Sequence, residues 1–158
     1  DFVKEVGQGG AAMLSKDRRY RYQLTRYWAE EGEPLVWIML NPSTADAVEN
    51  DPTIRRCIGF SKTFGARSLI VVNLFALRAT DPKELLKDPK GSIGEQNERI
   101  LSEMLQHAPR IVAGWGAMSN KLWAAAKPPR EVIKKYQKNL FCLGKTKNGA
   151  PRHPLYVP

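Results

Sequence analysis

The stretch "LVWIMLNPSTAD" (residues 35–46) decides the fold prediction, because its apolar run stops abruptly at an Asn-Pro pair. Pro42 has no N–H to donate to a sheet, and it disfavours the helical conformation for the residue before it. The pattern therefore predicts a buried strand over 35–40 with Asn41 at its carboxyl end. A loop of small and acidic residues follows, and we expect the Asn41 amide to face the space that this loop encloses.

Other segments of the chain continue the pattern that this strand begins. Three further apolar runs predict buried strands, at 68–77 ("SLIVVNLFAL"), 110–117 ("RIVAGWGA") and 139–144 ("NLFCLG"). The intervening segments predict helices over 51–65, 81–88, 94–108, 119–126 and 128–138. The first of these has Asp51 as its N-cap and Pro52 at its first position, which is a common helix start.

Alternation of strands and helices is typical of a mostly parallel sheet with helices on both faces. We predict one α/β domain spanning residues 1–158, with a three-layer α/β/α architecture around a central, mostly parallel four-stranded sheet. Residues 18–30 predict one more strand, and the Gly-rich residues 1–16 predict a loose lead-in.

In such folds ligands bind beyond the carboxyl ends of the strands. Four unusual segments are expected at that edge: Asn41-Pro42-Ser43, Asn73, Gly114-Trp115-Gly116 and Arg152-His153-Pro154. Each of them follows or ends one of the four predicted core strands. We therefore expect one site that all four segments share.

The composition excludes several classes of protein. No apolar stretch is long enough for a membrane span, and the amino end lacks the layout of a signal peptide, so we expect a cytoplasmic protein. Cys57 and Cys142 lie among apolar neighbours without the spacing of a metal site, which predicts buried free thiols in a reducing compartment. Two cysteines are too few for a cysteine-ligated iron cluster. We expect a monomer without metal or cofactor.

The positive charge is concentrated in the carboxyl-terminal part of the chain. The formal net charge is +9, and residues 119–158 contain nine Lys and Arg against the single acid Glu131, a balance of +8. One interpretation is a solvated face on a basic protein. The other is a surface that faces a polyanion, with DNA as the first candidate.

Four sequence blocks resemble the motifs of the uracil-DNA glycosylase superfamily. They are "MLNPS", "LIVVNLFALRATDPKEL", "IVAGWGAMSNKL" and "RHPLYVP", in that order, within residues 35–157. A bacterial and phage branch with "LNPSTAD" and "HPLY" blocks is also similar. The resemblance implies a glycosylase-like fold and hydrolysis of the N-glycosidic bond of an abnormal or modified base. Such an enzyme flips the base out of the stack and leaves an abasic site, in a repair or a phage-defence role.

The resemblance also implies catalytic roles. Asn41 occupies the position that orients the attacking water, and His153 the position that stabilises the oxygen of the leaving base. Asn cannot act as an anionic base, so Asp46 is the nearest candidate for that role. The plain structural alternatives are that Asn41 caps its loop and that His153 is an ordinary surface residue.

Base recognition is expected from the same edge. Asn73 has an amide donor and acceptor that suit a pyrimidine edge, although it could instead be a buried amide bonded to backbone. Pro42 and Ser43 are expected to line the base pocket, and Trp115 either stacks on the base or belongs to the core. Ser43 replaces the bulky Tyr of the uracil-specific branch, which implies room for a 5-substituted or enlarged pyrimidine.

Contacts to DNA are expected around the mouth of this pocket. The candidates are Thr44, Lys145, Lys147, Arg152, Leu155 and Tyr156. Leu155 and Tyr156 follow His153 where the superfamily inserts a wedge into the duplex, and an apolar side chain there holds the stack open. Ser43 and Thr44 either accept a phosphate or cap their loop.

Two other functions fit the same sequence. A nucleic-acid-binding module could keep the fold without the chemistry, since Asn41 stands in place of a carboxylate. Alternatively, a hydrolase of free nucleosides or nucleotides would not need the basic carboxyl-terminal third. Formation of abasic sites in a modified duplex distinguishes the glycosylase from the binding module.

Overall fold

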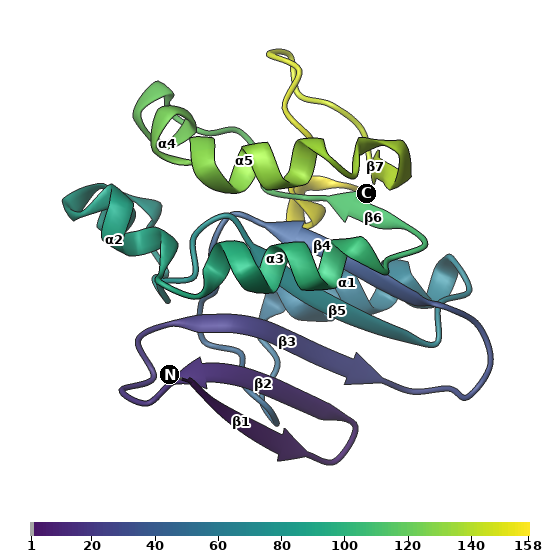
Figure 1. Ribbon diagram of the computed structural model, residues 1–158. Helices are drawn as coiled ribbons and strands as arrows, with labels where there is room; N and C mark the ends of the chain where they lie inside the picture. Colours follow the sequence, from purple (N-terminus) through teal and green to yellow (C-terminus); the bar gives the residue numbers. More distant parts are fainter. Residues whose placement is uncertain (1) are drawn as a thin grey trace.

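The computed structural model describes residues 2–158, and these build one seven-stranded sheet (Figure 1). The strand order is β1-β2-β3-β5-β4-β6-β7. The strands are β1 (Phe2–Gly7), β2 (Gly10–Ser15), β3 (Arg21–Tyr27), β4 (Pro34–Met39), β5 (Ser68–Asn73), β6 (Ile111–Ala113) and β7 (Leu140–Cys142).

The sheet is mixed, and this corrects the predicted four-stranded, mostly parallel sheet. The predicted core strands β5, β4, β6 and β7 pair in parallel, with Trp37 opposite Val71 and Ile38 opposite Ala113. β1, β2 and β3 add three antiparallel strands beside β5. The α/β class is confirmed, but the sheet is wider than predicted and its pairings are half antiparallel.

Residues 2–15 are not a loose lead-in, and this prediction was wrong. They form the β1–β2 hairpin, in which Gly7 pairs with Gly10 and Gly9 adopts φ +74° in the turn. β2 alternates buried and half-buried residues, and Ala12 and Leu14 are both 1% exposed. The period-2 pattern was present in the sequence, but the small residues that carry it gave a weak signal.

Helices occupy the connections between strands. They are α1 (Pro52–Thr63), α2 (Pro89–Ile93), α3 (Asn97–Gln106), α4 (Asn120–Ala125) and α5 (Lys127–Lys134), with 3-10 turns η1 (Pro82–Lys87), η2 (Gln137–Asn139) and η3 (Pro154–Tyr156). The helices expected over 51–65, 94–108 and 119–126 are found. The segment 81–88 is a 3-10 helix, α5 ends four residues earlier than 138, and α2 was not predicted.

Three of these elements begin at an Asp-Pro pair, in α1, η1 and α2. The carboxylates of Asp51, Asp81 and Asp88 each accept a hydrogen bond from a backbone N–H of the first turn. Asp81 and Asp88 are exposed, whereas Asp51 is only 8% exposed. The same capping chemistry is therefore placed in two different environments.

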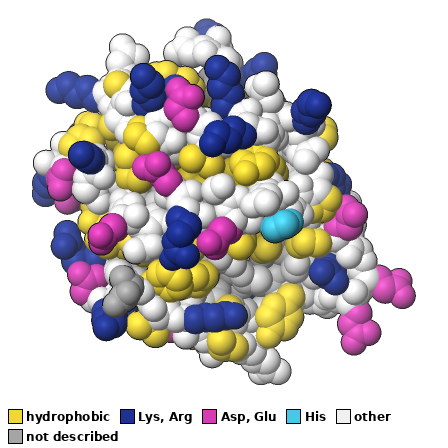
Figure 2. All heavy atoms as spheres, in the orientation of Figure 1, with side chains coloured by type: hydrophobic (Ala, Val, Ile, Leu, Met, Phe, Trp, Pro, Cys, Tyr) yellow, Lys and Arg dark blue, Asp and Glu magenta, His cyan; other side chains and the backbone are white. Residues whose placement is uncertain are grey.

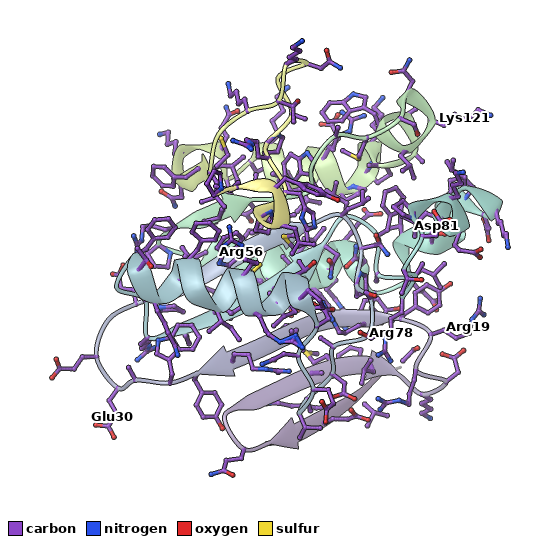
Figure 3. All side chains as sticks on the ribbon, turned by 180° about the vertical axis from the view of Figure 1, so that it is seen from behind. Arg19, Glu30, Arg56, Arg78, Asp81 and Lys121 are labelled. Atoms are coloured by element: carbon purple, nitrogen blue, oxygen red, sulfur yellow. The ribbon has the colours of Figure 1, made fainter. Side chains whose placement is uncertain are left out.

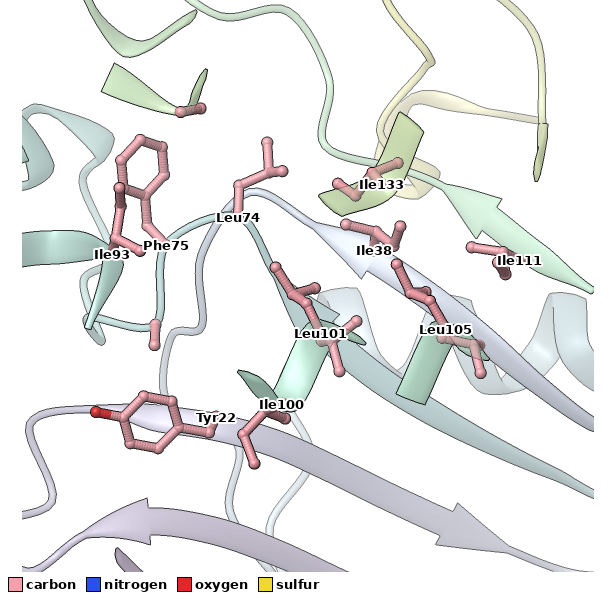
Figure 4. Packing of buried hydrophobic residues seen from close by; sticks show 14 of the residues in the cluster. Tyr22, Ile38, Leu74, Phe75, Ile93, Ile100, Leu101, Leu105, Ile111 and Ile133 are labelled. Carbon is pink, nitrogen blue, oxygen red and sulfur yellow. The ribbon is translucent and has the colours of Figure 1, made fainter. Parts of the chain in front are cut away.

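The helices cover both faces of the sheet, so the core has two layers. On one face Ile54 and Cys57 of α1 pack against Leu35 and Trp37 of β4. On the other face α3, α4 and α5 pack against Val36, Ile38 and Val72. Figure 4 shows Ile100, Leu101 and Leu105 of α3 in the cluster that also contains Ile38 of the sheet and Ile133 of α5. Burial of each such side chain contributes about 1.5–3 kcal/mol.

Only one of the two cysteines is buried. Cys57 of α1 lies in the core, where burial raises the pKa of its thiol. Cys142 is a free thiol on the edge strand β7 and is exposed, contrary to the prediction, and its neighbour Phe141, which points to the opposite face, is exposed as well. Among residues 2–158, no helix is long and apolar enough to cross a membrane.

Candidate functional site

A cavity of about 550 Å³ lies at the carboxyl ends of β4, β5 and β6. The segments expected at this edge all contribute to its lining. The lining includes Asn41, Pro42, Ser43, Asn73, Trp115, Gly116, Arg152, His153, Leu155 and Tyr156. The structure therefore brings together the three side chains on which the predicted site depends, Asn41, Asn73 and His153.

Asn41 is held in a defined orientation. Its side-chain N–H₂ donates to the carbonyl oxygens of Pro42, at 3.0 Å, and Ala79, at 2.8 Å. Two carbonyl acceptors fix which end of the amide is nitrogen. Asn41 therefore caps its loop, which was the alternative to a catalytic role. Its amide oxygen accepts no hydrogen bond from residues 2–158 and is available to a ligand.

Asn73 lies at the base of the cavity with an unpaired side chain. It is 0% exposed, and neither its side-chain nitrogen nor its oxygen has a hydrogen-bond partner in the described part of the chain, residues 2–158. The end of β5 is held instead by Asn97, whose N–H₂ donates to the carbonyl oxygens of Asn73 and Leu74 at 2.9 and 3.0 Å. A buried amide without partners is costly, so this arrangement favours a ligand that completes it.

His153 presents one defined nitrogen to its surroundings. Its Nδ1 accepts a hydrogen bond from the Leu155 N–H at 3.2 Å, so in neutral imidazole the proton resides on Nε2. Burial lowers the pKa of His153 below its ordinary value of 6.5, while Asp51 acts in the opposite direction. Gly116 adopts φ +73° beside this residue, and a Cβ there would lie 3.3 Å from the His153 Cβ. Close packing therefore holds a neutral N–H donor at the cavity.

Three arginines hold the loop that follows β4 through its backbone carbonyls. Arg78 donates to Ser43 and Thr44, and Arg21 donates to Ala45, all at 3.0 Å. Arg26 donates to the carbonyls of Asp46 and Glu49. Figure 3 shows Arg78 beside this loop. Because three arginine side chains hold its backbone carbonyls, the loop has a fixed shape at the cavity wall.

Asp46 does not line the cavity. Its Oδ1 accepts hydrogen bonds from the N–H groups of Val48 and Glu49, and its Oδ2 lies 3.5 Å from Arg18. The two N–H groups lower the pKa of Asp46. Thr44 is exposed and does not line the cavity either. The structure therefore does not place Asp46 where a base for this cavity would lie, whereas the expected contact of the exposed Thr44 with DNA stays a prediction.

Asp51 and Arg21 line the cavity but were not predicted as site residues. Arg21 is 2% exposed, its Nε has no partner, and burial lowers its pKa to about 10 against the opposing effect of Asp51. Asp51 was recognised only as a helix cap, and Arg21 lies on a strand outside the four motifs. A repeated Asp-Pro pair gives no signal of which copy is buried.

The carboxyl-terminal segment forms the rim of the cavity. Residues 144–152 form a hairpin with Lys145 opposite Pro151, and Lys145 and Lys147 are exposed on it. Leu155 and Tyr156 of η3 are 41% and 74% exposed. Arg56 of α1 donates to the carbonyls of Pro154 and Val157 and anchors this segment (Figure 3).

The basic residues of α4, α5 and the turn after α5 do not line the cavity. Figure 2 shows mainly Lys and Arg among the charged side chains over α4 and α5.

A second hollow, of about 900 Å³, is lined by Tyr20, Tyr22 and charged residues, of which four are acidic and two are basic. That balance makes it a poor site for a polyanion. Among residues 2–158, no group of three or more His, Cys, Asp or Glu is arranged to hold a metal ion.

A family model described as "Protein of unknown function (DUF1643)" matches residues 21–155, most of the chain. The chain belongs to the DUF1643 family. The match begins at Arg21 and ends at Leu155, so it includes the cavity lining except Tyr156. The β1–β2 hairpin lies outside it. No curated protein and no solved structure matches the chain.

Proposed function

We propose that this protein is a DNA glycosylase of the uracil-DNA glycosylase superfamily, which hydrolyses the N-glycosidic bond of a modified base. The observation that carries the proposal is the unpaired amide of Asn73 at the base of the cavity. Within residues 2–158, four buried side-chain nitrogen or oxygen atoms lack a partner, and three of them belong to Asn73 and Arg21. A base edge with a donor and an acceptor would satisfy the amide.

The other cavity residues supply the remaining chemistry of base release. In the proposed reaction, a flipped base enters the cavity and pairs with Asn73. The Nε2–H of His153 donates to the base oxygen on which negative charge develops, and a positioned neutral donor is effective there. The free amide oxygen of Asn41 accepts a hydrogen bond from water and orients it towards the sugar.

The rim of the cavity suits a duplex in which one base is flipped out of the stack. Leu155 and Tyr156 are exposed beside the opening, and one of them would fill the gap in the stack. Lys145, Lys147 and Arg152 lie on the adjoining hairpin and would contact phosphates. We therefore propose DNA as the partner, bound by this rim.

The wall of the cavity favours a large base. Ser43 lines it, and the volume of about 550 Å³ lies within the range of sites for drug-sized ligands, more than an unsubstituted pyrimidine fills. We propose a pyrimidine with a substituent at the 5-position as the substrate, rather than uracil alone.

The test is incubation of the protein with duplexes that contain single modified bases. Alkaline cleavage then detects abasic sites, and mass spectrometry identifies the released base. Release from at least one duplex is expected. Binding of duplexes without release would instead support the binding module, and release from free nucleosides alone, with little salt dependence, would support the small-molecule hydrolase.

A further inference from the structure

Within residues 2–158, Asp51 is the one carboxylate among the side chains that line the cavity. It follows the 41–50 loop, while Asn41 begins that loop, so the loop brings both of its ends to one cavity. The Oδ1 of Asp51 accepts from the Ile54 N–H at 2.8 Å, and its Oδ2 accepts from the Ala45 N–H at 3.4 Å. Each carboxylate oxygen can accept a further hydrogen bond.

Helix capping alone does not explain the position of Asp51. Asp81 and Asp88 make the same Asp-Pro start and are exposed, whereas Asp51 is 8% exposed. A buried charge is costly unless other groups compensate it. The nearby unpaired Nε of Arg21 and the unpaired amide of Asn73 line the same cavity, and these independent observations indicate a site for a ligand.

We propose that Asp51 is the catalytic base that accepts a proton from the attacking water. This inference rests on the proposed glycosylase function. The water oxygen bonds to C1′ of the sugar while the C1′–N bond breaks, and its electron pair leaves with the base. One water proton moves to Asp51 and then to solvent, and the released base takes a proton from solvent. Asn41 orients the water, and Arg21 balances the charge of Asp51.

The decisive variant is Asp51→Asn, because the Asn amide oxygen can still cap α1 but cannot accept the proton. The assay is the single-turnover rate of base release from a duplex that the wild-type protein cleaves. We expect the rate to fall about 10²- to 10⁴-fold, the usual contribution of a general base, with an unchanged Kd for the duplex. Asp88→Asn is the matched control, a capping carboxylate outside the cavity, and should keep the wild-type rate.

The pH profile provides a readout that a purely structural role would not change. The wild-type rate should rise with pH as the base loses its proton, and this rise should disappear in Asp51→Asn. The charged or titratable groups around Asp51 are Arg21 and Arg26 on β3, Cys57 on α1 and His153 after β7. His153 is present in both proteins, so any limb that it causes should remain.

Three outcomes would overturn the assignment. A folded Asp51→Asn protein with a rate within threefold of wild type would exclude Asp51 as the base. Loss of rate in Asp46→Asn with retention in Asp51→Asn would transfer the role to Asp46. If Asp51→Asn does not fold, Asp51→Ser keeps a capping oxygen and must show the same loss. A wild-type protein that releases no base from any duplex overturns the proposed function and this step together.

Discussion

Replacing Asn73 with Leu should stabilise the protein and abolish its activity. Asn73 is 0% exposed, and both polar atoms of its side chain lack partners. An unsatisfied buried polar group costs about 1–3 kcal/mol, and an apolar side chain of similar size removes that cost. We therefore expect the free energy of unfolding to rise by about 1–3 kcal/mol. For a chain of this length, Tm should rise by about 2–12 °C.

Asn97 offers a matched control within 24 residues of the same chain. It is also 0% exposed and its Oδ1 has no partner within residues 2–158, but its N–H₂ donates to the carbonyls of Asn73 and Leu74. Asn97→Leu should therefore lower the free energy of unfolding by about 1–3 kcal/mol, because two buried carbonyls lose their donor. The two variants make the same chemical change and should shift stability in opposite directions.

Denaturant unfolding of both variants and the base-release assay measure these effects. A site that keeps unsatisfied polar groups for its ligand is expected to do so at a cost in stability. A marked loss of stability in Asn73→Leu would show that the Asn73 amide holds the fold together. Wild-type activity in Asn73→Leu would show that the amide does not bind the substrate.

Three further predictions concern the cavity and its rim. Ser43→Tyr should slow release of 5-substituted bases more than release of unsubstituted ones, by on the order of 1–3 kcal/mol in activation free energy, because a packed wall excludes bulk. An equal loss of rate on both kinds of base would show that Ser43 does not face the base. Neutralising Lys145, Lys147 and Arg152 together should reduce the slope of log K for duplex binding against log salt by about 2 to 3; an unchanged slope would mean that the hairpin is only solvated. Burial lowers the pKa of His153, so its neutral donor form should persist as pH falls through 6.5. The loss of activity at acid pH in a pH–rate profile should therefore have its midpoint below 6.5, and a midpoint above 6.5 would contradict this.

The sequence was sufficient to predict the parallel half of the sheet and the residues that meet at its edge. The apolar runs of β4 and β5 are uninterrupted because both faces of these strands are buried, and a run of this kind is readable without context. Asn41, Asn73 and His153 could be placed together because each one ends a predicted core strand or lies in the segment that follows it. Strand position alone carried that prediction.

The remaining features depend on contacts that no local pattern encodes. The pairing of β2 rests on small residues such as Ala12, which bury little area and give little periodicity. Asp51 and Asp88 both precede a proline at a helix start, and only the surrounding fold buries Asp51. Asp46 was predicted as the base because it is the nearest candidate to Asn41 in sequence, yet its carboxylate lies beside Arg18 and does not line the cavity.

The antiparallel strand β3 is as important to the site as the parallel strands whose ends surround the cavity. Arg21 and Arg26 both lie on β3, and both donate to carbonyls of the loop between β4 and α1. That loop carries Ser43 and leads into Asp51, so its shape depends on a strand that contributes to none of the four sequence motifs. Both guanidinium groups are buried, and their hydrogen bonds to these carbonyls offset part of the cost of removing them from water. The antiparallel half of the sheet therefore supports the candidate site by fixing the loop that connects Asn41 to Asp51.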